Sequence, residues 1–113
     1  MQKIKYLLNR VKEEPEKYIG KPDAELLNSF IDGIIVYHLI AENNGIIVLP
    51  GFRDFICKKY TDPGIDYSFM KIICMNSRNK EEAFYKFYEL LEEFIDKSEN
   101  DYQQFVALKF EKN

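Results

Sequence analysis

Apolar residues recur at helical spacing most regularly between Asn79 and Lys97, in the sequence NKEEAFYKFYELLEEFIDK. Intervals of three and four residues place them along one broad face of a helix. Asn79, followed three residues later by Glu82, matches the pattern of an N-terminal capping box. We therefore expect an amphipathic helix whose apolar face anchors the core. That face comprises Ala83, Phe84, Phe87, Tyr88, Leu90, Leu91, Phe94 and Ile95.

The longest apolar stretch of the chain begins after Pro22. Pro22 and Asp23 suit the start of a helix and Gly45 suits the position after its end, so we expect a helix to about Asn43. Its interior is apolar on almost every side of the helical wheel. Such a helix is buried on several sides, and we expect it at the centre of the domain.

Shorter segments complete an all-α pattern. Residues 45–49 are apolar enough for a strand, but the sequence offers no partner strand of similar strength. Residues 106–110 alternate as in a strand, although a helix that starts near Asn100 also fits. We predict one compact all-α domain of about five or six helices around the central apolar helix. The other helices are expected over residues 2–14, 52–60, 66–75 and 100–108, with a loop or single helical turn around Tyr18 and Ile19.

Length and composition fit a single domain without a membrane span. The chain has 113 residues, of which 46% are hydrophobic, enough for one compact core. It has no run of about 18 apolar residues, and its N-terminal sequence lacks the apolar core of a signal peptide. We therefore expect a cytoplasmic location and no membrane contact. Cys57 and Cys74, the only cysteines, lie in apolar sequence and are expected to be buried free thiols.

The net charge of the chain is concentrated in one predicted helix. The chain has 16 basic and 19 acidic residues, a net charge of −3, and residues 79–97 alone have three basic and six acidic residues, also −3. These acidic side chains fall opposite the apolar face. Glu89 with Glu93, and Glu92 with Asp96, are like-charge pairs four residues apart, which weakens a helix. The arrangement is not what helix stability alone would favour.

Two interpretations of this acidic face stay open. It is an ordinary solvated surface, or it binds a basic partner; Tyr85 favours binding, because tyrosine is enriched at interfaces. A second acidic group precedes residues 66–75, where Asp62 also suits a turn or cap. The candidate partner-binding residues are Glu81, Glu82, Tyr85, Glu89, Glu92 and Asp96, with Asp62 and Asp66 in second rank.

The sequence lacks the motifs of common enzyme classes. His38 is the only histidine and no nucleophile motif accompanies it, so we interpret it as structural. All five glycines are isolated, which excludes a glycine-rich phosphate loop, and the two cysteines lack zinc-site spacing. Mild acidity disfavours direct nucleic-acid binding, which needs a basic surface. We predict no catalytic site, metal or cofactor.

The order of these segments resembles a known family. Residues PEKYIG are similar to an R-P-x-M-Y-[IL]-G element, with Glu14 in place of the arginine and Lys17 in place of the methionine. Together with LNSFIDGIIVYHLI and EEAFYKFYELLEEF, this element resembles the small immunity proteins of bacterial contact-dependent growth-inhibition and polymorphic toxin systems. The resemblance covers roughly Tyr6 to Ile95.

The resemblance implies a non-enzymatic cytoplasmic inhibitor that binds its cognate toxin domain, often a basic nuclease. An acidic face would speed association with such a partner and disfavour wrong ones. The alternative is an adaptor or regulatory protein-interaction module, or a homodimer that pairs through its aromatic surface.

Overall fold

The described part of the chain is built from helices, which confirms the all-α prediction. The computed structural model describes residues 2–43, 45–60 and 67–97, and within these ranges there is no strand, including at residues 45–49. The candidate site residues Asp62 and Asp66, and the elements predicted within residues 98–110, lie outside the described residues. In chain order the helices are α1 (Gln2–Glu13), α2 (Pro15–Tyr18), α3 (Ala24–Ala41), α4 (Phe52–Lys59), α5 (Phe69–Met75) and α6 (Lys80–Lys97).

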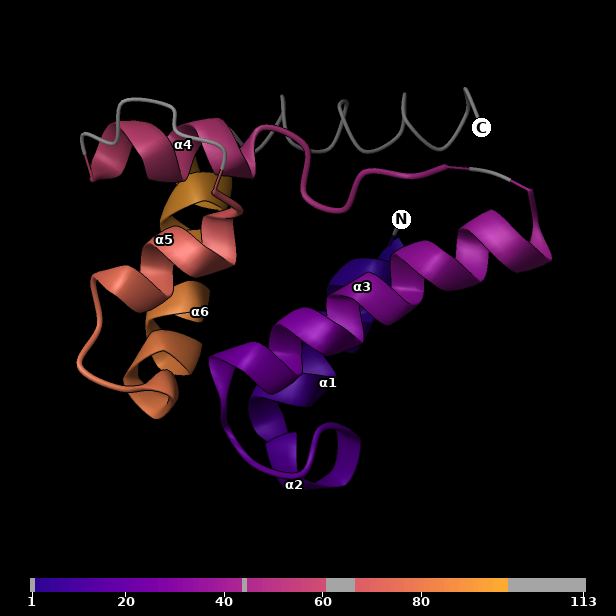
Figure 1. Ribbon diagram of the computed structural model, residues 1–113, viewed down its shortest axis with the longest axis horizontal. Coiled ribbons are helices and arrows are strands. Elements are labelled where there is room, and N and C mark those ends of the chain that lie inside the picture. The colour runs from indigo at the N-terminus through magenta and orange to yellow at the C-terminus, as the bar shows by residue number, and fades with distance from the viewer. Residues whose placement is uncertain (1, 44, 61–66, 98–113) are drawn as a thin grey trace.

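The helices form two groups that meet along α3 (Figure 1). Helices α1 to α3 lie on one side, and α4 to α6 on the other, with the segment after α3 crossing back over the top to reach α4. Helix α6 packs against α3, α4 and α5, and α3 also contacts α5. The contacts of α3 with α6 and α5 therefore join the two groups.

The core is built around the aromatic face of α6. Phe84 and Phe87 are fully buried, as is Phe52 at the start of α4. The hydroxyl of Tyr88 donates a hydrogen bond of 2.7 Å to the backbone carbonyl of Leu8, which ties α6 to α1. The prediction that this face anchors the core is confirmed.

Side-chain caps fix where α3 and α5 begin. Asp23 Oδ1 accepts hydrogen bonds from the backbone N–H groups of Glu25 and Leu26, as expected from its position before α3. Ser68 Oγ accepts from the N–H of Lys71 at the start of α5. Helix α4 instead follows Gly51, whose φ of +85° is the left-handed conformation that glycine adopts without strain.

The prediction that α3 is buried on several sides is wrong. Only Ala24, Leu27 and Ile31 are buried, all in the first half of the helix. The second half extends away from α4 to α6 (Figure 1), and most of its large apolar side chains, Val36, Tyr37, Leu39 and Ile40, remain exposed. The helix also ends earlier than expected, at Ala41, because Asn43 takes the left-handed conformation that the sequence pattern assigned to Gly45.

Helix α3 has one further property that follows from its composition. Its 18 residues have a mean hydropathy of 1.3, so by length and composition alone it is long and apolar enough to cross a membrane. The core helix of a globular protein passes the same test. The expectation of no membrane contact therefore stays a prediction.

Candidate protein-binding site

The acidic face of α6 is held toward solvent by the burial of the opposite face. Asn79 Oδ1 accepts a hydrogen bond of 2.8 Å from the backbone N–H of Glu82, which caps the first turn as predicted. The Glu82 carboxylate does not complete a capping box; it pairs with Arg78 at 2.8 Å. The cap and the core contacts together fix the rotation of α6 about its own axis.

Five of the predicted residues form one narrow line along α6. At about 100° per residue, their side chains fall within roughly 80° of the helix circumference. At 1.5 Å per residue, the line is about 22 Å long. All five are exposed. We call this line the acidic strip; it comprises Glu81, Tyr85, Glu89, Glu92 and Asp96.

The four carboxylates of the acidic strip have no compensating charge in direct contact. Among the residues that the structure describes, none of the four lies within 4 Å of a lysine, arginine or histidine nitrogen. Glu92 and Asp96 remain a like-charge pair four residues apart, which weakens the helix locally. The strip therefore presents to solvent carboxylates that have no direct ion pair in the described part of the chain.

Glu82 and Glu93 lie beside the strip but are neutralised within the chain. Glu82 pairs with Arg78 and, at 3.6 Å, with Lys86. Glu93 accepts hydrogen bonds of 2.7 and 3.0 Å from Lys59 Nζ of α4. The hydrogen bond from Arg78 lowers the pKa of the Glu82 carboxyl. The predicted site residue Glu82 is thus already occupied by partners.

The pairing of Glu93 could not be found in the sequence. Lys59 is 34 residues away, and only the packing of α4 against α6 brings the two together. The pairs of Glu82 with Lys86 and of Glu93 with Lys97 carry a sequence signal, because residues four apart face one another on a helix.

Tyr85 lies in the middle of the acidic strip. Its side chain is 46% exposed, and its ring meets the buried Phe84 ring edge-on with centroids 5.1 Å apart. The ring is therefore anchored at its base while one side remains available to a partner. This is the geometry of an amphipathic anchor at a protein interface.

Two lysines of α1 lie across a shallow groove from part of the acidic strip. Helices α1 and α6 enclose a cavity of about 220 Å³ in which Lys5 and Lys12 of α1 lie opposite Glu92. Lys12 Nζ also lies 5.8 Å from the centroid of the Tyr88 ring. The two lysines carry a sequence signal, since they are seven residues apart on one helix face, but their placement beside α6 depends on the fold.

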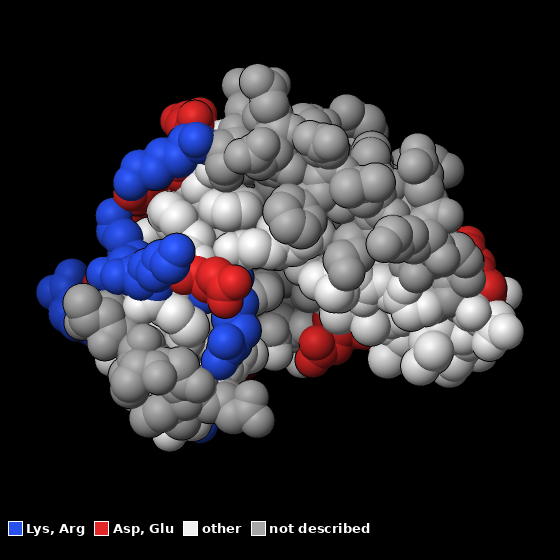
Figure 2. All heavy atoms as spheres, turned by 90° about the horizontal axis from the view of Figure 1, so that it is seen from above, with Lys and Arg blue, Asp and Glu red and all other residues white. Residues whose placement is uncertain are grey.

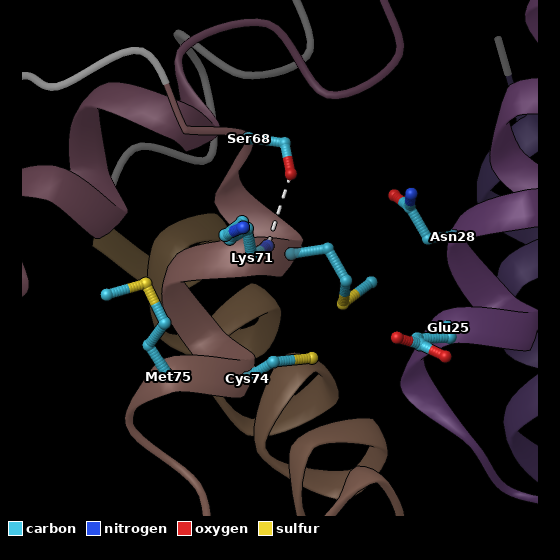
Figure 3. Close-up of a pocket in the computed structure, with 7 residues that line it drawn as sticks. Glu25, Asn28, Ser68, Lys71, Cys74 and Met75 are labelled. Carbon is cyan, nitrogen blue, oxygen red and sulfur yellow. Dashed lines mark hydrogen bonds between the residues drawn. The ribbon is translucent and has the colours of Figure 1, made fainter.

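A second cavity, of about 430 Å³, separates α3 from α5 (Figure 3). Cys74 points into it toward Glu25, whereas Met75 points away. Burial raises the pKa of the Cys74 thiol, and the negative charge of Glu25 adds to this effect. A thiol with a raised pKa is a poor nucleophile at neutral pH. The Glu25 carboxylate itself forms an ion pair with Lys80, with Nζ 2.6 Å from Oε1.

Other residues with catalytic chemistry have structural partners. His38 Nδ1 lies 2.8 Å from the Glu42 carboxylate one turn later in α3. Cys57 is a buried free thiol, as expected, and Cys74 is partly buried. Within residues 2–43, 45–60 and 67–97 there is no group of three or more His, Cys, Asp or Glu side chains that could hold a metal ion.

No protein-family model, curated protein or solved structure matches this chain. The resemblance to immunity proteins therefore stays a prediction, as do the partner, the cytoplasmic location and the absence of catalysis.

Proposed function

We propose that this chain is a non-enzymatic immunity protein that binds and neutralises a cognate toxin domain in the cytoplasm. The toxin domain would carry a basic surface, as a nuclease does. The observation that carries the proposal is the acidic strip, in which four exposed carboxylates have no ion pair among the described residues. Nearby acidic residues are neutralised by Arg78, Lys59 and Lys86, so on α6 the carboxylates without an ion pair lie along one line.

The position of Asp96 supports a binding role over a stabilising one. It lies in the last turn of α6, where the helix dipole disfavours negative charge. It also lies four residues after Glu92, a like charge. A basic side chain at this position would stabilise the helix. A partner that brings positive charge to the strip would remove both unfavourable interactions on binding.

The strip would act on the rate of association and on partner choice. Complementary charge steers a basic partner toward its binding site and is screened as salt concentration rises. Tyr85 would supply the apolar contact that charge alone does not provide. A nuclease binds the phosphates of its substrate through basic residues, so the same basic residues would be available to the strip.

An adaptor role in a larger assembly is the second candidate. It is favoured by the exposed apolar side chains on the second half of α3, because such side chains are typical of protein-interaction surfaces. An adaptor would bind partners that have no toxic activity.

The test is protection of cells from a toxin domain encoded beside the gene for this chain. We expect co-expression of this chain to restore growth, and the two proteins to co-purify. A chain with Glu89→Lys and Asp96→Lys should protect less well than one with Glu13→Lys and Glu16→Lys, which changes the net charge equally. Recovery of the chain from its native host with non-toxic partners only would favour the adaptor instead.

A further inference from the structure

The exposed apolar residues of the chain are unevenly distributed. The described residues include nine large apolar side chains that are exposed, and four of them lie in the second half of α3. Each of the four exposes between 49% and 77% of its surface. We call this group the α3 apolar end; it comprises Val36, Tyr37, Leu39 and Ile40.

Packing within the described part of the chain does not account for these residues. From Gly33 to Ala41 the helix contains no acidic or basic residue other than His38. A side chain placed at Gly33 would meet nothing within 4 Å, so internal packing does not require a glycine there. Glycine weakens a helix relative to alanine, but on an exposed face it allows another backbone to approach closely.

An apolar groove continues the surface. Helices α1 and α3 enclose a cavity of about 570 Å³, lined on its apolar side by Ile4, Leu7, Phe30 and Ile34. Tyr37 also lines this groove and belongs to the α3 apolar end, so the two surfaces are continuous. A ridge of exposed aliphatic residues beside a groove is the shape that accepts an amphipathic helix.

Apart from His38, the charged side chains that the second half of α3 and its flanks place beside this surface are acidic. Asp32 lies on the same face of α3 as Val36, one turn earlier, and is exposed without an ion pair among the described residues. Glu42 also lines the groove; its Oε1 lies 2.8 Å from Nδ1 of His38, another lining residue, and its Oε2 has no hydrogen-bond partner among the described residues. Seen from above, the end of the molecule formed by α3 shows no Lys or Arg in its described part (Figure 2). Asp32 and Glu42 are separated by about 15 Å along the helix.

These acidic residues disfavour two possible occupants of the surface, a second copy of the chain and a membrane. A second copy of the chain that paired its α3 antiparallel about Tyr37 would place Asp32 against Glu42 of the other copy. A parallel pair would place Asp32 against Asp32, and like charges in contact disfavour association. Helices that lie on membranes carry basic residues beside their apolar face, whereas this surface carries acidic ones.

We propose that the α3 apolar end and its groove bind an amphipathic helix of another protein, with basic residues flanking the apolar face of that helix. Its apolar residues, at intervals of three and four, contact Val36, Ile40 and the groove. Its basic residues pair with Asp32 and Glu42. The surface is separate from the acidic strip, so this inference does not depend on the toxin-binding role of the strip.

Selection from a displayed library of random peptides tests the chemistry of the occupant directly. The folded chain is used for selection, and peptides that also bind the Ile40→Ser variant are discarded because they bind outside the α3 apolar end. We expect enriched peptides with apolar residues at helical spacing and Lys or Arg at both ends. Enrichment of peptides with acidic ends, or no enrichment over the Ile40→Ser chain, would overturn the proposal.

Affinity of the enriched peptide for matched variants locates its site. Ile40→Ser should weaken binding about tenfold, as for a central interface residue, whereas Met75→Ser, a change at another exposed apolar residue in α5, should not. Asp32→Asn should weaken binding and reduce its salt dependence, whereas Asp54→Asn should do neither. Equal effects within either pair would contradict the assignment of the site.

Two measurements on the chain alone test whether a second copy of the chain or a membrane occupies the surface instead. Sedimentation equilibrium should show a monomer, and co-flotation with vesicles of neutral or anionic lipid should show no binding. A dimer that Ile40→Ser dissociates would assign the surface to a second copy. Vesicle binding that Ile40→Ser abolishes would assign it to a membrane. Either result would overturn the proposal.

Discussion

At the residue scale, the core depends on a small number of aromatic rings. The ring of Phe52 lies 5.0 Å from that of Phe69, 5.7 Å from that of Phe87 and 5.4 Å from that of Phe94, measured between centroids. These contacts join α4 to both α5 and α6. The sequence identified the apolar residues of each segment, but which ring meets which depends on how the helices cross.

Replacement of Phe52 by alanine should be strongly destabilising. A fully buried phenylalanine changed to alanine costs about 3–5 kcal/mol of unfolding free energy, through lost burial and the cavity that remains. Phe55→Ala, at a partly exposed position in the same helix, should cost less. Urea denaturation of the two variants checks this. A cost for Phe52→Ala no larger than for Phe55→Ala would contradict the packing described.

Tyr88 should make the chain sensitive to alkaline pH. Burial raises the pKa of its phenol above the ordinary value of 10.0. The folded state therefore holds the neutral form while the unfolded state ionises, so the contribution to stability is complete below pH 10 and is lost as pH rises further. Tyr88→Phe should reduce the loss of stability above pH 10, whereas Tyr85→Phe should leave that loss unchanged. The measurement is the urea midpoint of each variant between pH 8 and pH 11, and equal slopes would contradict the buried phenol.

At the scale of elements, α6 was predictable and the surroundings of α3 were not. The apolar residues of α6 repeat regularly and its cap is local, so position and buried face both follow from the sequence. In α3 the sequence is apolar on most sides, so its periodicity does not predict which faces of the helix pack against other helices. The structure leaves its second half exposed. The pairing of Glu93 with Lys59 likewise required the tertiary fold.

Reversal of charge at Asp96 should separate stability from binding. In Asp96→Lys the new lysine lies four residues after Glu92, which should stabilise α6 by a few tenths of a kcal/mol, with a further small gain from its place in the last turn. The same change should weaken binding of the toxin domain. Thermal unfolding and affinity measured on one preparation check both effects, with Asp96→Asn as the uncharged control. A variant that is less stable, or binds equally well, would contradict the role given to the strip.

At the scale of the whole molecule, the fold presents two exposed surfaces of different chemistry. The acidic strip is on α6 and the α3 apolar end is on α3, and the first turns of these helices are joined by the ion pair of Lys80 with Glu25. The sequence predicted the first surface because its charge is concentrated in one segment. It did not predict the second, because exposed and buried apolar residues look alike before the chain folds.

The association rate of the chain with its cognate toxin domain, measured at low and physiological salt, tests the central claim most directly. Glu89→Lys with Asp96→Lys is compared with Glu13→Lys with Glu16→Lys, an equal change in net charge at exposed positions away from the strip. We predict that the strip variant associates at least about tenfold more slowly at low salt and with weaker salt dependence, while the control stays close to the unmodified chain. Equal rates for the two variants would contradict a binding role for the acidic strip.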